Sequence, residues 1–159
     1  MSRLNQGQEK IGTGKQQGYH SEVSTSATPA EAFDKISRVQ EWWSKNFEGA
    51  SKKVDDVFTV RFLSGDRYKI RVAESSPNQR IVWDVIDAFQ SWVKNSSEWK
   101  GTRIIWEIGG DRNAGVSIAM THAGLVPGFE CFSRCEKGWD YLVHDSLSKL
   151  LSEGKGLPV

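Results

Sequence analysis

The feature that most restricts the fold of this chain is a long amphipathic stretch, residues 129–152. At about 100° per residue, its large apolar side chains fall on one broad face, and polar or charged side chains fall opposite. The apolar face carries Phe132, Cys135, Trp139, Leu142, Val143, Leu147 and Leu150. As a helix the stretch is about 36 Å long, and Gly154 is placed to end it with a left-handed cap. One apolar side of this length requires a large apolar partner.

Alternating segments supply that partner. Apolar and polar residues alternate in several segments, which is typical of strands with one buried and one wet face. Strands are predicted over residues 20–27, 57–62, 68–72, 80–89, 102–110 and 116–120. Two short helices follow the first strand: one begins at a Thr28–Glu31 capping box with Pro29 in its first turn, and one spans residues 39–44.

These elements predict an α+β fold in a single domain. A curved antiparallel sheet of about six to seven strands wraps around the long C-terminal helix, and the two short helices come after the first strand. Residues 1–18 are polar and have almost nothing to bury, so they are predicted to form a disordered tail. The domain is predicted to span residues 19–156.

Composition excludes several classes of protein. The chain has 159 residues, and its net charge of +1 argues against a nucleic-acid partner. It has no apolar run long enough to span a membrane and no signal peptide. Its two cysteines, Cys131 and Cys135, lie one helical turn apart on the face expected to be buried, so we expect no disulfide, a reducing compartment and a cytoplasmic location.

Several short motifs, in this order, resemble the START-like (helix-grip) superfamily, and within it proteins similar to the activator of the heat-shock protein 90 ATPase. They occupy residues 28–33 (TPAEAF), 41–43 (EWW), 81–83 (IVW), 121–125 (THAGL), 138–141 (GWDY) and 150–156 (LLSEGKG). The resemblance covers roughly residues 19–156 and implies the helix-grip fold. The superfamily includes lipid carriers, plant ligand-binding proteins, polyketide cyclases and chaperone activators, and it shares no catalytic motif. No catalytic residue is therefore carried over.

A hydrophobic cavity between helix and sheet is the leading hypothesis for function. The helix face includes small residues, Cys131, Cys135, Gly138 and Ser146, which either leave a cavity or let the helix approach the sheet closely. The hydroxyl of Ser146 needs a partner, which a ligand, a water or the backbone supplies. Candidate lining residues are Phe58, Phe62, Tyr68, Trp83, Trp106, Met120, Cys135, Trp139, Leu142 and Ser146. The alternative for the aromatic residues among them is an ordinary core.

Three further tryptophans are candidates for the rim of the cavity. Trp92 and Trp99 lie in a polar connection, residues 90–101, and Trp42 lies in the second short helix. A partner-binding patch or a cover for the sheet edge are the alternatives for Trp92 and Trp99.

Other functions find less support. Cys131 and Cys135 with His122 and His144 lack the spacing of a zinc site, so neither metal nor cofactor is predicted. Charged side chains on the wet sheet face are expected to form cross-strand pairs, or else a docking surface for a chaperone. They are Arg61, Lys69, Arg71, Asp84 and Glu107.

The sequence thus favours a non-catalytic protein that binds an unidentified hydrophobic small molecule. A chaperone-activating interaction module is second. A polyketide cyclase-like enzyme is third, and Ser146, Tyr68 and His122 are its only candidate polar groups.

Overall fold

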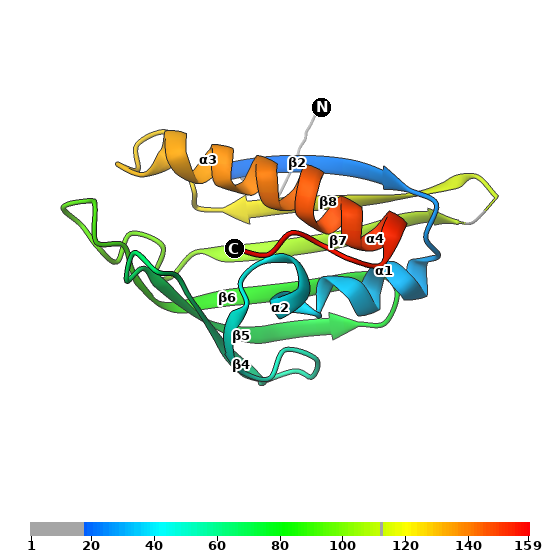
Figure 1. Ribbon diagram of the computed structural model, residues 1–159, viewed down its shortest axis with the longest axis horizontal. Helices are drawn as coiled ribbons and strands as arrows, with labels where there is room; N and C mark the ends of the chain where they lie inside the picture. The colour runs from blue at the N-terminus through cyan, green and yellow to red at the C-terminus, as the bar shows by residue number, and fades with distance from the viewer. Residues whose placement is uncertain (1–17, 112) are drawn as a thin grey trace, which may run out of the picture.

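A computed structural model describes residues 18–111 and 113–159, and Figure 1 shows one curved sheet with the helices on one of its faces. The sheet has seven antiparallel strands in the order β2-β8-β7-β6-β5-β4-β3. The strands are β2 (Gly18–Thr25), β3 (Asn46–Gly49), β4 (Val57–Arg61), β5 (Arg67–Ser76), β6 (Arg80–Phe89), β7 (Arg103–Asp111) and β8 (Gly115–Ala123). The predicted α+β architecture is confirmed, and the short strand β3 forms one edge of the sheet.

The sheet curves because the pairing of its central strands is interrupted. Between β5 and β6 the register shifts at Lys69/Ile70 and again at Val72/Glu74. Such bulges bend a strand and increase its twist. The inner face becomes concave, and the alternating apolar side chains on it, such as Ile70 and Trp83, are completely buried.

Two short helices follow β2, as predicted. Helix α1 (Pro29–Ile36) begins at a complete capping box, in which the Glu31 amide donates to the Thr28 hydroxyl and the Thr28 amide donates to the Glu31 carboxylate. Helix α2 (Val39–Trp42) is a single turn, and both ends of its sequence, Val39 and Trp42, are buried. Packing rather than intrinsic helix stability therefore holds α2 in place.

The long helix runs from Phe132 to Glu153 and contains an irregularity that the sequence pattern did not predict. It consists of α3 (Phe132–Asp140), a π-helical segment η1 (Tyr141–Leu147) and α4 (Ser148–Glu153). The predicted orientation is correct, because Trp139 is 1% exposed whereas Tyr141 is 38% exposed. The predicted left-handed cap is also present, since Gly154 has φ 79° and its amide donates to the Leu150 carbonyl.

The last residues of the chain belong to the domain, beyond the predicted limit of residue 156. The Val159 amide donates to the Trp43 carbonyl, and the Lys45 amide donates to the Val159 carbonyl. The predicted tail, residues 1–18, lies outside the described residues except for Gly18, which begins β2 opposite Ala123. Within the described residues, no helix is long and apolar enough to cross a membrane.

Candidate functional site

The centre of the interface between helix and sheet is solid. Trp42 packs on Trp83 and Trp106 with ring centroids 6.5 and 5.5 Å apart, and Trp83 lies 5.6 Å from Trp106. Four predicted lining residues belong to this core, because each is at most 1% exposed and none reaches the pocket described below: Phe58, Trp83, Trp106 and Met120. Trp42, predicted at the rim, is also completely buried, and its indole N–H donates to the Ile36 carbonyl. Aromatic residues thus fill the space where the cavity was predicted.

Ser146 ties this solid region together instead of facing a cavity. Its hydroxyl donates to the Trp42 carbonyl at 2.6 Å and accepts from the Leu157 amide at 2.8 Å. The helix, α2 and the C-terminal segment therefore meet at one buried side chain. A side-chain Cβ at Gly156 would lie 2.4 Å from the Glu41 carbonyl oxygen, so the C-terminal segment passes α2 at close range. The hydroxyl obtains its partners from the backbone, and Ser146 is not a lining residue.

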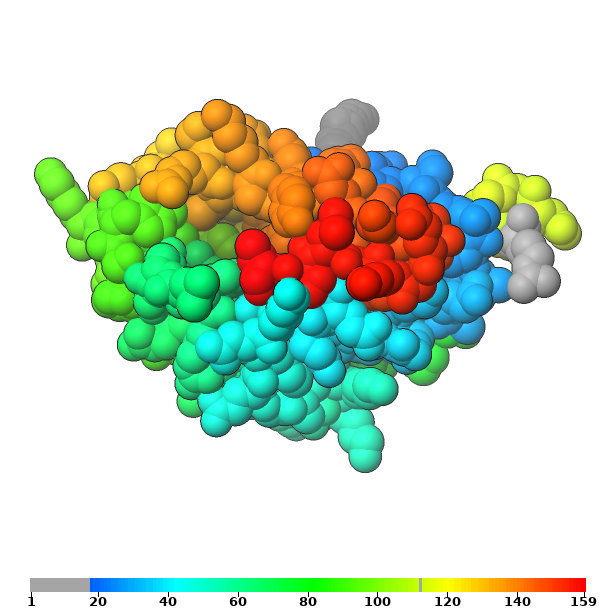
Figure 2. Space-filling view, viewed as in Figure 1, coloured from blue at the N-terminus to red at the C-terminus, as the bar shows by residue number. Residues whose placement is uncertain are grey.

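An open pocket of about 280 Å³ lies at the other end of the long helix. It is bounded by α3, the β4–β5 turn and the connection between β6 and β7, and Figure 2 shows the surface recessed between the orange helix and the green turn. Its lining residues are Trp43, Phe62, Ser64, Asp66, Tyr68, Gln90, Trp92, Trp99, Arg134, Cys135, Gly138, Trp139 and Leu142. Most of its surface is aromatic or aliphatic.

Stacked rings form the inner wall of the pocket. Tyr68 and Trp99 stack with centroids 4.1 Å apart and an interplanar angle of 20°, and Trp99 is parallel to Trp139 at 6.0 Å. Trp43 lies 5.1 Å from Trp139, which connects this wall to the tryptophans of the core. The wall is therefore one end of the continuous aromatic core, and it borders the pocket on one side.

The structure brings together seven of the predicted lining and rim residues. These are Phe62, Tyr68, Trp92, Trp99, Cys135, Trp139 and Leu142. Sequence reasoning did not assign Trp43, Ser64, Asp66, Gln90 or Arg134 to the site. Gln90 carried one usable signal, since it is a polar residue directly after a strand rich in apolar residues.

Trp92, Asp66 and Arg134 form the mouth of the pocket. The Trp92 indole N–H donates to Asp66 Oδ2 at 2.8 Å, and the guanidinium of Arg134 lies over the Trp92 ring, 4.4 Å from its centroid. Asp66 Oδ1 accepts from both the amide and the hydroxyl of Ser91. These contacts explain why a polar connection carries a tryptophan: Trp92 links the β4–β5 turn to α3.

Polar atoms also gather at the buried end of the pocket. Gln90 is completely buried, and its Nε2 donates to the Tyr68 hydroxyl at 2.8 Å and to Cys135 Sγ at 3.4 Å. Its Oε1 has no hydrogen-bond partner among the described residues. Burial raises the pKa of Tyr68. A hydrogen bond from the Cys135 thiol lowers the pKa of Cys131, and the same bond together with burial raises the pKa of Cys135.

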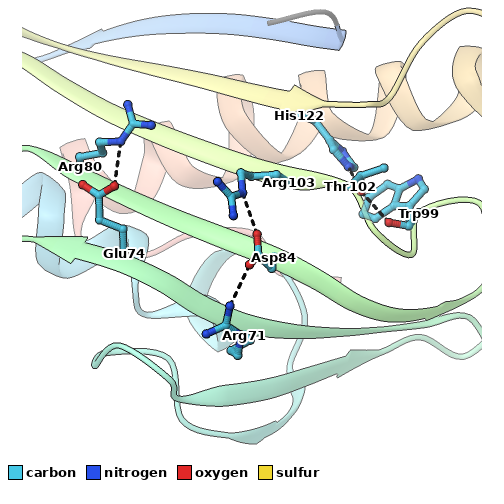
Figure 3. A network of polar contacts seen from close by, with 8 residues as sticks. All are labelled: Arg71, Glu74, Arg80, Asp84, Trp99, Thr102, Arg103 and His122. Atoms are coloured by element: carbon cyan, nitrogen blue, oxygen red, sulfur yellow. Dashed lines mark hydrogen bonds and ion pairs between the residues drawn. The ribbon is translucent and has the colours of Figure 1, made fainter. Parts of the chain in front are cut away.

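His122 lies behind the pocket wall and does not line the pocket. The Trp139 indole N–H donates to His122 Nδ1 at 3.0 Å, so the ring carries its proton on Nε2, which faces the Thr102 hydroxyl at 2.8 Å. That hydroxyl donates to the Trp99 carbonyl at 2.6 Å (Figure 3). Burial lowers the pKa of His122 to about 3. The ring is therefore neutral and joins the two tryptophans of the wall to the sheet.

Four of the five charged residues predicted on the outer sheet face form cross-strand pairs, whereas Lys69 forms no ion pair with another described residue. Asp84 binds Arg103 at 2.7 Å and Arg71 at 3.0 Å, as Figure 3 shows. Arg61 pairs with Glu48 at 2.7 Å, and Glu107 pairs with Arg80 at 2.9 Å. In residues 18–111 and 113–159, no group of three or more His, Cys, Asp or Glu side chains is placed to hold a metal ion.

No protein-family model matches this sequence, and no curated protein matches it. Solved structures do resemble it. The Aha1 dimer from Colwellia psychrerythraea is 20% identical, with a TM-score of 0.69 over 87% of this chain and 98% of that one. The chain has the helix-grip fold.

Two further structures support the same assignment. Protein MLL2253 from Mesorhizobium loti is 14% identical, with a TM-score of 0.68 over 85% of this chain and 96% of that one. DynU16, from the dynemicin biosynthetic locus, is 19% identical, with a TM-score of 0.63 over 87% of this chain and 48% of that one. This chain thus spans about half of DynU16. At these identities the likeness concerns the helix-grip fold alone.

Proposed function

We propose that this protein binds a small, largely apolar molecule, without catalysing a reaction, in the pocket at the start of α3. The observation that carries the proposal is the contrast within one interface: the centre is filled, whereas this end leaves about 280 Å³ open to solvent. Ligand sites are typically concave, mostly apolar and equipped with a few polar groups. The pocket matches this description through its aromatic walls and through Gln90 and Tyr68.

The chemistry of the lining residues favours binding over catalysis. A general acid or base works best when its pKa lies near the operating pH. The pKa values of Tyr68 and Cys135 are both raised, away from neutrality. Asp66 has both oxygens engaged by Ser91 and Trp92. His122, the remaining candidate, lies behind the wall.

The second candidate function is a module that binds another protein through its surface. The charged residues that would form a docking surface pair largely with one another, as Asp84 does with Arg71 and Arg103. Exposed pairs of this kind are ordinary features of a solvated sheet face. Cys131 and Cys135 are both free and buried, which supports the expectation of a reducing, cytoplasmic location as part of the proposal.

Gly138→Leu tests the proposed pocket. Gly138 lines the pocket from α3, and a Cβ there would meet nothing within 4 Å. A leucine should be accommodated in this space, and it should stabilise the helix by about 0.5–1 kcal/mol, because glycine is unfavourable inside a helix. We expect a higher melting temperature in thermal denaturation. Calorimetric titration should show that the variant no longer binds small aromatic compounds.

Gly128→Leu is the matched control, since a Cβ there also meets nothing within 4 Å and Gly128 does not line the pocket. It should leave binding unchanged. If wild-type protein bound none of a panel of one-ring and two-ring aromatic compounds, the proposed function would be wrong. The same would follow if Gly138→Leu bound them as tightly as wild type.

A further inference from the structure

We propose that the pocket selects a small, flat aromatic molecule bearing a hydroxyl group, which inserts with that hydroxyl between Gln90 and Tyr68. The inference rests on the proposed function and adds to it the chemical class of the ligand. Its basis is a buried, unpaired hydrogen-bond acceptor next to a free donor at the closed end of an aromatic pocket.

The acceptor is Oε1 of Gln90. The side chain is completely buried and lines the pocket, yet this oxygen has no hydrogen-bond partner among the described residues. An unpaired buried carbonyl is expensive, so buried polar atoms in native proteins nearly always have partners. A ligand that donates a hydrogen bond would satisfy Gln90 and gain affinity from doing so.

The two ends of the Gln90 amide have different surroundings. Nε2 of Gln90 lies 2.8 Å from the Tyr68 hydroxyl oxygen and 3.4 Å from Cys135 Sγ, and it donates to both. The remaining atom, Oε1, is the one that needs a donor from outside.

The donor is the hydroxyl of Tyr68. Its oxygen accepts from Gln90 Nε2 at 2.8 Å, and its own hydrogen has no acceptor within residues 18–111 and 113–159. A ligand hydroxyl satisfies both groups at once, because it donates to Gln90 Oε1 and accepts from Tyr68. A methyl ether only accepts, and a hydrocarbon does neither. Gln90 and Tyr68 therefore discriminate among ligands that share a ring system and differ in its substituent.

The rest of the ligand is defined by the walls and the volume. Tyr68, Trp99 and Trp139 present stacked rings, which favour a flat aromatic partner in an offset or edge-to-face arrangement. A dry cavity of about 150 Å³ holds one benzene ring, so 280 Å³ accommodates a compound of about two rings. Arg134 is exposed and lies over the Trp92 ring at the mouth of the pocket, whereas Gln90 is completely buried, so Arg134 is the group that a substituent on the outer ring would meet.

Three probes of one shape test the inference by calorimetric titration of the full chain: 2-naphthol, 2-methoxynaphthalene and naphthalene. Wild-type protein should bind 2-naphthol about tenfold more tightly than either of the others, a ratio typical of one good hydrogen bond in a buried site. Gln90→Met keeps the length and bulk of the side chain but removes the acceptor. It should abolish this preference and leave naphthalene binding within about twofold. The exposed Gln79→Met is the matched control and should behave as wild type.

The outcomes separate the two proposals. If all three probes bind wild type equally, or if Gln90→Met retains the preference for 2-naphthol, the pocket binds ligands but the hydroxyl inference is wrong. If 2-methoxynaphthalene matches 2-naphthol, the pocket recognises an acceptor and the inference is also wrong. If none of the probes binds, the proposed function and the inference are both overturned. Naphthalene binding by Gln90→Met shows in addition that the variant is folded with its pocket intact.

Discussion

The interface between the long helix and the sheet has tryptophans at both of its ends, but one end is filled and the other contains an open pocket. Around Ser146 the tryptophans Trp42, Trp83 and Trp106 are completely buried. Around Gln90 the rings of Trp43, Trp92, Trp99 and Trp139 border open space. Aromatic composition is therefore not what makes a cavity in this fold.

The two ends differ in how closely other chain segments cover the aromatic core. At the Ser146 end, α2 and the C-terminal segment fill the gap and are fastened there by hydrogen bonds to Ser146, Trp43 and Lys45. At the Gln90 end the β4–β5 turn and the connection between β6 and β7 border the helix but leave the pocket open. The connection is held to the segment before α3 near the surface, where the Lys94 amide donates to Glu130 and the amides of Glu130 and Cys131 donate to Glu98. A cavity remains where no chain segment covers the core.

Replacing one tryptophan at each end should give the largest contrast. Trp106→Ala removes a fully buried ring from the solid end and should cost about 3–5 kcal/mol in the free energy of unfolding. Trp92→Ala removes a half-buried ring at the pocket mouth and should cost half of that or less. Urea melts measure both, and equal losses would show that the two ends are packed alike.

Acid should weaken the wall behind the pocket through His122. Its pKa is about 3 in the folded protein, below the value of about 6.5 in an unfolded chain. Below pH 6.5 the unfolded state therefore binds a proton that the folded state does not, so stability is lost as the pH falls. The loss from this group is about 2 kcal/mol between pH 7 and pH 5.

His122→Gln separates this effect from other titrations. A glutamine can accept from the Trp139 indole and donate to the Thr102 hydroxyl, but it does not titrate. We expect the variant to lose about 2 kcal/mol less than wild type over the same pH interval, measured by urea melts at each pH. Parallel pH profiles for the two proteins would contradict the buried, neutral histidine.

Ser146→Ala tests whether the Ser146 hydrogen bonds hold α2 and the C-terminal segment against the long helix. The change leaves the Trp42 carbonyl and the Leu157 amide without their partner and should cost about 1–3 kcal/mol. Ser64→Ala at the pocket is the control, because the Ser64 hydroxyl only accepts from the Asp66 amide at 3.3 Å. Its effect on the melting temperature should be much smaller, and a reversed order would contradict the role given to Ser146.

Arg134→Gln should have the smallest effect on stability, about 0.5–1 kcal/mol, through the lost contact with the Trp92 ring. Arg67, whose guanidinium lies 4.8 Å from the Phe89 ring centroid, provides a matched control outside the pocket lining. Arg67→Gln should cost a similar amount. Only Arg134→Gln should change the affinity for two-ring aromatic compounds, and equal binding by both variants would remove Arg134 from the site.

The fold was predictable because its signals are local and periodic. The alternation of residues 57–62, the capping box at Thr28 and the glycine at 154 each depend on neighbouring residues, and each is present in the structure. The orientation of Trp139 also followed from periodicity alone. These features needed no knowledge of how distant segments meet.

The site was predicted only in part because its position depends on distant segments. Periodicity places Trp83 and Trp139 on facing surfaces, but it does not reveal that Trp42 and Trp43 pack against Trp83 and fill the space beside it. Ser146 was assigned to a cavity because its partners, Trp42 and Leu157, are 104 and 11 residues away. Gln90 was missed because its partners Tyr68 and Cys135 are 22 and 45 residues away.

The π-helical segment Tyr141–Leu147 divides the long helix into two parts that make different contacts. α3 faces the pocket through Cys135, Gly138 and Trp139, whereas α4 packs against α1. Such segments commonly arise as single-turn irregularities within α-helices, frequently near functional sites. Substitutions in α3 would change the shape of the pocket while α4 keeps its packing against α1, so the pocket could vary among related sequences without a change in the rest of the fold.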